Sequence, residues 1–117
     1  ITLCGFVTEQ EKVKLIDKSH FLIAPSLKEG WGLTVHEAGA RGVPTIAYNV
    51  SGLKEVVNHK NGVLVENNTP ASLADSCIKL FNNKKVYSSL QKGAVEERKK
   101  YSWENTNKSF LKIIMGV

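Results

Sequence analysis

The chain has 117 residues, and its 42% hydrophobic and 23% charged residues are typical of one compact globular domain rather than a disordered chain. No apolar run approaches the roughly 20 residues that are needed to span a bilayer. The net charge is +5, but the basic residues are scattered and no aromatic-basic module accompanies them, so we expect no nucleic-acid partner.

The first half of the chain alternates short apolar runs with amphipathic stretches. Residues 3–7 are apolar and predict a strand, and a chain that opens on a core strand suggests that upstream sequence belongs to the same domain. Thr8 and Glu11 have the spacing of a capping box at the start of a helix. Further strands and helices are predicted, in alternation, at residues 21–24, 34–41, 43–48, 53–57 and 63–65.

Continuously apolar strands that alternate with helices indicate a parallel sheet that is buried on both faces. We therefore predict an α/β, Rossmann-like sheet of about four strands, flanked by helices. Thr69 with Pro70 predicts the start of a helix, a second helix is expected near 86–100, and Ser102 caps a third. Residues 1–117 form one domain in this interpretation, with βα repeats and the site in 1–66 and helices in 67–117.

The loop and helix start at residues 25–37 lie where parallel sheets bind ligands, after the carboxyl end of a strand. Gly30 and Gly32 have no side chain, so a ligand can approach the backbone closely. The first amides of the helix, those of Leu33 and Thr34, lack helical partners and favour an anion such as phosphate.

Two carboxylates flank this anion site. Glu29 lies in the loop and Glu37 in the second turn of the helix, and carboxylates accept hydrogen bonds from sugar hydroxyls. A diphosphate between two sugars, as in a nucleotide sugar, matches this pattern, with Glu37 on the ribose and Glu29 on the donor hexose. The alternatives are a tight turn shaped by the glycines, a helix-dipole role for Glu37 and a solvated Glu29.

Nearby aromatic residues have simpler interpretations. Trp31 is more typical of a core or interface than of a stacking platform, and His36 is expected to be exposed and ordinary. The loop does not match the G-x-G-x-x-G or Walker patterns, so neither a dehydrogenase nor a P-loop NTPase is supported.

The run P-S-x-x-E-G-W-G-L-T-x-x-E-A at residues 25–38 resembles glycosyltransferase family 4, the "group 1" family of retaining GT-B enzymes, with their E-x7-E pair at Glu29 and Glu37. Four more pieces resemble the family in the same order, and the resemblance covers nearly the whole chain. These pieces are residues 42–44 with the strand that follows, 51–57, 61–65 and 102–104.

The resemblance implies that the chain is the later part of a carboxy-terminal, donor-binding domain, inactive without an amino-terminal domain that binds the acceptor. Backbone amides around Gly32, Leu33 and Thr34 would meet the diphosphate and the donor sugar, with Gly30 and Trp31 in the same loop. Glu37 would hold the ribose and Glu29, as the catalytic carboxylate, would lie at the sugar hydroxyls. Phe6 would lie near the base, Gly52 and Glu55 would shape a neighbouring wall, and the helix after Ser102 would cross towards the amino-terminal domain.

The expected activity is the transfer of a sugar from a nucleotide-sugar donor to a sugar, lipid or protein acceptor, with retention of configuration. No cofactor or metal is expected, because the cysteines and histidines have no metal-ligand spacing. We expect a cytoplasmic protein, and a peripheral association of the full protein with the inner membrane surface is compatible with the motifs. The alternatives are a non-catalytic nucleotide-sugar-binding module and another GT-B enzyme, an epimerase or a phosphorylase.

Overall fold

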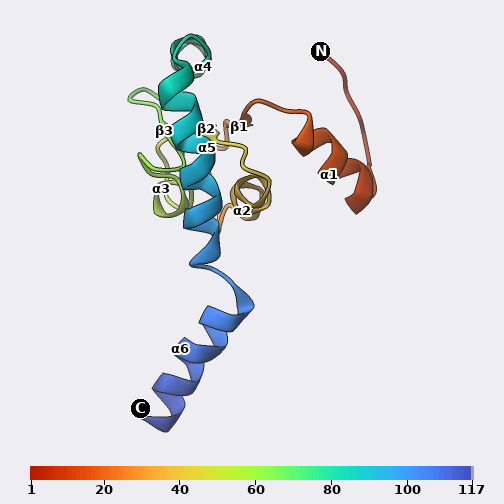
Figure 1. Cartoon of the computed structure of the whole chain (residues 1–117). Coiled ribbons are helices and arrows are strands. Elements are labelled where there is room, and N and C mark those ends of the chain that lie inside the picture. Colours follow the sequence, from red (N-terminus) through yellow and green to blue (C-terminus); the bar gives the residue numbers. More distant parts are fainter. Residues whose placement is uncertain (117) are drawn as a thin grey trace.

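The computed structural model describes residues 1–116 and has an α/β architecture. Three short strands alternate with helices in the first part of the chain, and three longer helices follow (Figure 1). The elements in order are α1 (Glu9–Asp17), β1 (Leu22–Ala24), α2 (Leu33–Ala40), β2 (Thr45–Ala47), α3 (Leu53–Val56), β3 (Gly62–Leu64), α4 (Pro70–Phe81), α5 (Lys84–Lys99) and α6 (Trp103–Met115).

The sheet is parallel, with the strand order β1-β2-β3. Ile23 pairs with Ile46 and Ile46 with Val63, so the three strands are in one register and their carboxyl ends meet at one edge. This arrangement confirms the predicted α/β fold class, and it places the loop after β1 at the edge where such sheets bind ligands.

Helices cover both faces of the sheet. Val35, Leu53 and Val56, from α2 and α3, pack against Ala24 and Ala47 on one face. On the other face, the buried residues of strands, α4 and α5 form a second cluster: Ile46, Tyr48, Val65, Leu73, Leu80 and Leu90. The central strand β2 is buried at all three positions, which explains why its residues do not alternate between apolar and polar. In the edge strand β1, Ile23 stays 41% exposed.

The prediction of a strand at residues 3–7 is wrong. The segment before α1 has no strand partner within residues 1–116, and Leu3 and Phe6 are almost fully exposed. A lone extended segment leaves its backbone N–H and C=O groups to water, so it gains no sheet hydrogen bonds. The sheet therefore has three strands in the described part of the chain instead of about four.

Helix α1 buries none of its side chains and is attached through charged groups. Its predicted capping box is present: Thr8 N donates to Glu11 Oε2 at 2.7 Å and Glu11 N to Thr8 Oγ1 at 3.2 Å. The Arg41 guanidinium holds Asp17, with 2.7 Å between Nη2 and Oδ2. This contact links α1 to the end of α2, and α1 lies to one side of the sheet and α2 in Figure 1.

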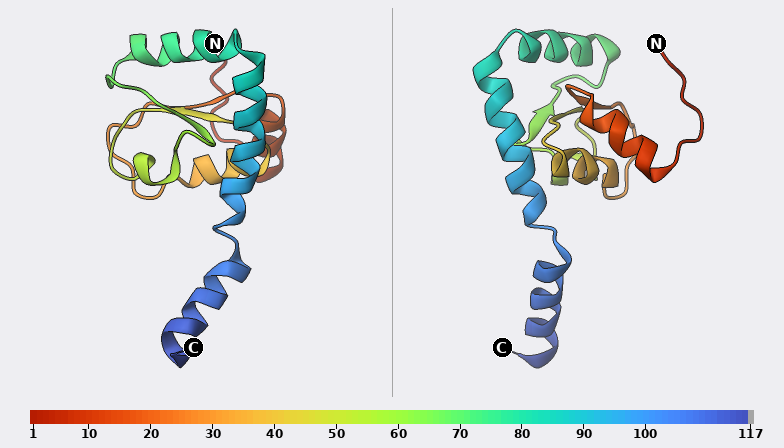
Figure 2. Two further views of the ribbon diagram at one scale, coloured as in Figure 1. Left: turned by 60° about the vertical axis from the view of Figure 1, so that its left-hand side comes forward. Right: turned by 45° about the vertical axis from the view of Figure 1, so that its right-hand side comes forward.

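The later helices begin at side-chain caps. Thr69 caps α4 with Pro70 at its first position, and Ser102 Oγ accepts from Asn105 N at 3.1 Å at the start of α6, as predicted. Helix α5 starts two residues earlier than expected because Asn83 caps it, accepting from Val86 N at 3.1 Å. Helix α6 extends away from the rest of the molecule in every view (Figures 1 and 2). Among the helices of residues 1–116, none is long and apolar enough to cross a membrane.

Candidate functional site

The loop between β1 and α2 ends in a glycine that no larger residue can replace without strain. Gly32 is the N-cap of α2 and has φ +67°, in the left-handed region that L side chains rarely adopt. A Cβ at this position would lie 2.9 Å from Val56 Cγ2. The chain therefore makes a left-handed turn at Gly32 to enter α2, and this turn packs directly against Val56 of α3.

The amino-terminal end of α2 is open to solvent. Val35 N donates to Gly32 O at 2.9 Å, and no side chain caps this end of the helix within residues 1–116. Leu33 and Thr34, whose N–H groups precede that first bond, are both exposed. Free N–H groups and the positive end of the helix dipole make this a place for an anion.

A second glycine supports the loop from α3. Gly52 has φ +89°, and a Cβ there would lie only 2.2 Å from Glu29 O and 2.9 Å from Gly30 O. Its N–H donates to Glu55 Oε2 at 2.8 Å, which holds the start of α3 in place. Gly52 and Glu55 therefore form a supporting wall beneath the backbone of residues 29 and 30.

The two flanking carboxylates lie at the surface rather than in the core. Glu29 is half-buried, and its Oε1 accepts from Gly30 N at 3.1 Å. Glu37 has 29% of its side chain exposed, and its Oε1 accepts from Lys12 Nζ at 3.0 Å. Hydrogen bonds to Glu37 and then Glu9 raise the pKa of Lys12, so α1 places a permanent cation beside Glu37.

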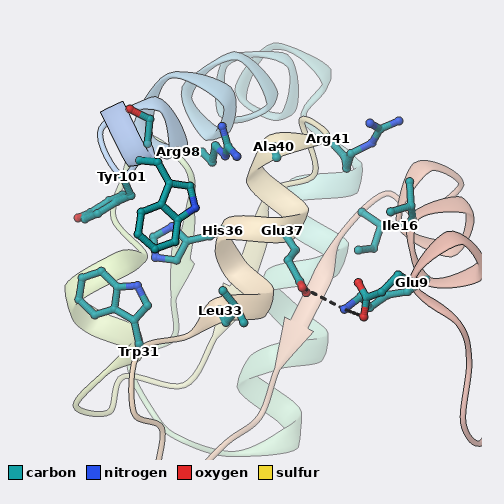
Figure 3. Close-up of a pocket in the computed structure, with 14 residues that line it drawn as sticks. Glu9, Ile16, Trp31, Leu33, His36, Glu37, Ala40, Arg41, Arg98 and Tyr101 are labelled. Carbon is teal, nitrogen blue, oxygen red and sulfur yellow. Dashed lines mark hydrogen bonds and ion pairs between the residues drawn. The ribbon is translucent and has the colours of Figure 1, made fainter. Parts of the chain in front are cut away.

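A cavity of about 580 Å³ lies against the outer side of α2 (Figure 3). Its lining includes Trp31, Leu33 and Glu37. Residues of α1 form one side of the cavity, and residues at the junction of α5 and α6 form the other. Glu29, Gly30, Gly32 and Thr34 belong to the adjoining loop and helix start, outside the lining.

Phe6 is not brought to this cavity. It lies in the exposed segment before α1, with 97% of its surface accessible, and it is absent from the cavity lining. Of the predicted site residues, the cavity brings together Trp31, Leu33 and Glu37, and Phe6 lies apart from them.

Three aromatic rings meet beside the loop, a feature that the sequence did not predict. The ring of Trp31 stacks on His36, with 5.5 Å between centroids and 25° between planes. The ring of Tyr101 meets both edge-on, at 5.5 Å from Trp31 and 4.7 Å from His36. Residues 31 and 101 are far apart in sequence, and no local pattern indicates their contact.

His36 is not the exposed, ordinary residue that we expected. It is half-buried under the other two rings, and its Nε2 is buried without a hydrogen-bond partner within residues 1–116. Burial lowers the pKa of His36, and the positive charge of Arg98 lowers it further. Both effects favour the neutral imidazole, which can stack on the indole of Trp31.

Helix α5 is anchored by a buried carboxylate that the sequence also did not reveal. Glu97 is 8% exposed, and it accepts hydrogen bonds from Lys100 Nζ at 2.7 Å and from Asn58 Nδ2 at 3.1 Å. The bond from Lys100, followed by that from Asn58, lowers the pKa of Glu97 against the opposing effect of burial. This contact ties the carboxyl end of α5, and hence Tyr101, to the segment after α3.

No group of three His, Cys, Asp or Glu side chains in residues 1–116 is placed to hold a metal ion. The groups that the site does offer are backbone amides, carboxylates, aromatic rings and the cations of Lys12, Arg41 and Arg98. Such a set can bind a polyhydroxylated anion: the amides take the negative charge and the carboxylates take hydroxyl groups.

The chain matches a family model described as "Glycosyl transferases group 1" over residues 1–97. It is 36% identical, over its full length, to an uncharacterized glycosyltransferase of Methanocaldococcus jannaschii, of which it covers 32%. It is 32% identical, over 92% of its length, to the D-inositol 3-phosphate glycosyltransferase of Nocardioides sp., of which it covers 24%. The chain therefore spans about a third or less of the length of these relatives.

Solved structures share the fold. Sucrose-phosphate synthase from Thermosynechococcus elongatus matches 99% of the chain with a TM-score of 0.82, and the chain covers 31% of it; at 23% identity this likeness concerns the fold alone. TarM of S. aureus, in a structure with fondaparinux, alpha-GlcNAc-glycerol and UDP, matches 86% of the chain with a TM-score of 0.73 and 28% identity. The chain covers 21% of that structure.

Proposed function

The chain belongs to the group 1 glycosyl transferases, and we propose that it holds the nucleotide-sugar donor of a retaining glycosyltransferase. The observation that carries this proposal is the open amino-terminal end of α2, which has free amides and lies between Glu29 and Glu37. The UDP in the TarM structure is the nucleoside diphosphate part of a UDP-sugar, which is one donor of the class that we propose here.

The amides of Gly32, Leu33 and Thr34 would bind the diphosphate. During transfer, the bond between the sugar and the diphosphate breaks and negative charge builds on the leaving group. Amides that are already oriented stabilise that charge without reorganisation, which lowers the barrier electrostatically. This proposal needs no metal ion, since the helix end and nearby side chains supply the positive potential.

The carboxylates would hold hydroxyl groups. Glu37 Oε1 accepts from Lys12, whereas its Oε2 makes no hydrogen bond within residues 1–116 and would be free for the ribose. Glu29 would accept from the hydroxyls of the donor sugar and thereby act in catalysis. Gly30 and Trp31 complete the loop, and Phe6 is left out because it lies apart from these residues.

The acceptor would be held by a separate, amino-terminal domain of the full protein, across a cleft from this site. Retention at the anomeric carbon and activity that depends on that second domain follow from the family resemblance. Sugars, lipids and proteins are all compatible acceptors, because the described residues are assigned to the donor only.

The proposal predicts that Glu37→Ala weakens donor binding by roughly 10- to 100-fold, because a hydrogen bond to a charged group contributes about 1.5–3 kcal/mol. Calorimetry with a panel of UDP-, GDP- and ADP-sugars on the full gene product measures this change. Glu96→Ala is the matched control, because Glu96 is an exposed carboxylate on α5 that pairs with Lys99 at the surface.

Unchanged donor affinity in Glu37→Ala would contradict the site assignment. A transfer assay on the same protein tests the reaction itself. Donor binding without sugar transfer would indicate a non-catalytic binding module, and conversion of the nucleotide sugar without any acceptor would indicate an epimerase. A requirement for inorganic phosphate would indicate a phosphorylase.

A further inference from the structure

The loop that would grip the donor is held from two sides. On one side, the carbonyls of Glu29 and Gly30 rest on Gly52, so closely that no Cβ fits between them. On the other side, the ring of Trp31 stacks on His36 and meets the edge of Tyr101. Because Trp31 directly precedes Gly32, the position of its ring constrains the peptide groups that open α2.

The three rings do not serve as an ordinary hydrophobic core. Trp31 is 50% exposed and Tyr101 is 44% exposed, and His36 is half-buried. All three face the cavity beside Glu37, as Figure 3 shows. Their contact therefore orders side chains at the rim of the site rather than filling the interior.

Tyr101 lies in the turn directly after helix α5, and the position of that helix is firmly set. Gly39 of α2 allows a close approach of α5, because a Cβ there would lie 3.1 Å from Ala94 O. Gly93 lies against the backbone of Lys60 even more closely, with a hypothetical Cβ 1.8 Å from Lys60 O. Together with the hydrogen bonds of Glu97, these contacts fix α5 and thereby place Tyr101 at the loop.

We propose that Tyr101 is a positioning residue for the nucleotide-sugar donor, acting through Trp31 and His36 on the amides of Gly32, Leu33 and Thr34. The inference rests on the proposed function and extends it to the junction of α5 and α6. Ser102 and Trp103, which follow Tyr101, line the same cavity as Trp31, so the start of α6 also borders the site.

The test uses Tyr101→Ala and Tyr101→Phe in the full gene product. Each aromatic pair contributes about 2- to 10-fold in an equilibrium constant. Losing both contacts of Tyr101 is therefore expected to raise the donor KM by about 4- to 100-fold. Tyr101→Phe keeps the ring and stays within about twofold of the wild type. The acceptor KM stays unchanged in both variants.

Two further variants control for folding. Tyr101→Leu fills much of the space without a ring, so it is expected to match Tyr101→Ala in donor KM while keeping a normal thermal unfolding midpoint. Phe81→Ala removes an aromatic ring that is 64% exposed on α4, away from the site, and leaves the donor KM unchanged. A donor KM in Tyr101→Leu equal to that of the wild type would overturn the proposal.

A double-mutant cycle with Trp31→Ala checks the route of the effect. Because Tyr101 acts through Trp31, the double variant is expected to raise the donor KM by clearly less than the product of the two single effects. Independent, multiplying effects would overturn the proposal, as would a defect in Tyr101→Phe equal to that in Tyr101→Ala. Glu37→Ala distinguishes the failure of this inference from the failure of the proposed function. If Glu37→Ala weakens donor binding but the Tyr101 variants leave the donor KM unchanged, the proposed function stands and only the role of Tyr101 is rejected.

Discussion

Gly52 shows how a single residue shapes the site without touching a ligand. Its positive φ and its contact with the carbonyls of Glu29 and Gly30 exclude every side chain at this position. Gly30, only two residues before Gly32, has nothing within 4 Å of a hypothetical Cβ and no positive φ. Gly52 and Gly30 therefore differ in physical role, although both belong to motifs that resemble the family.

We predict that Gly52→Ala destabilises the protein by at least about 1–3 kcal/mol from backbone strain alone, and displaces the loop in addition. Gly30→Ala is the matched control and leaves the free energy of unfolding within about 0.5 kcal/mol of the wild type. Urea denaturation measures both. Equal stability of the two variants would show that the loop leaves room for a Cβ at position 52, against the close contact of Gly52 with the Glu29 carbonyl.

At the scale of elements, capping patterns were predicted well and tertiary partners were not. Thr8, Thr69 and Ser102 each cap the expected helix, because a cap is made within four residues and needs no distant neighbour. The strand expected at residues 3–7 did not form, since an apolar run becomes a strand only where another strand pairs with it.

The attachment of α5 through Glu97 leads to a prediction at this scale. Glu97→Ala is expected to destabilise the protein by about 1–3 kcal/mol, because it leaves the amide of Asn58 without its acceptor. Glu96→Ala, on the exposed side of the same helix, is expected to have almost no effect.

The pH dependence of this contribution follows from the lowered pKa of Glu97. The carboxylate is favoured in the folded state, so its stabilisation is complete above the ordinary glutamate pKa of 4.5 and is lost as the pH falls through the lower folded value. Denaturation curves at several pH values should converge for wild type and Glu97→Gln in acid. Parallel curves down to the lowest pH would contradict the assignment.

At the scale of the whole molecule, helix α6 is separate from the body. None of its side chains is buried, and it extends away from the sheet in all views (Figures 1 and 2). The apolar residues on it, among them Phe110, Ile113 and Ile114, are mostly exposed. Such a surface is prone to association and adds little to the stability of the folded body.

We predict that removing residues 103–117 lowers the thermal unfolding midpoint of the chain by less than about 4 °C, which corresponds to under about 1 kcal/mol. The shortened chain should also associate less, because the exposed apolar face is gone. Calorimetry and light scattering measure the two effects. A larger fall in the midpoint would show that α6 packs on the body in solution.

The sequence alone determined the features that depend on neighbouring residues. Helix caps, the parallel strand pattern and the open loop before α2 could be predicted because each depends on local hydrogen bonding or on continuous apolar runs. The spacing of Glu29 and Glu37 likewise places one in the loop and one on the helix, and their roles in the site stay a prediction.

Only the tertiary structure decided which distant groups meet. The contact of Tyr101 with Trp31, the anchoring of Glu97 by Asn58, the pairing of Lys12 with Glu37 and the isolation of Phe6 all depend on where α1 and α5 lie relative to α2 and to the rest of the fold. Such contacts join residues across 25 to 70 positions of sequence. They follow from close packing of whole elements, for which a single sequence carries no local signal.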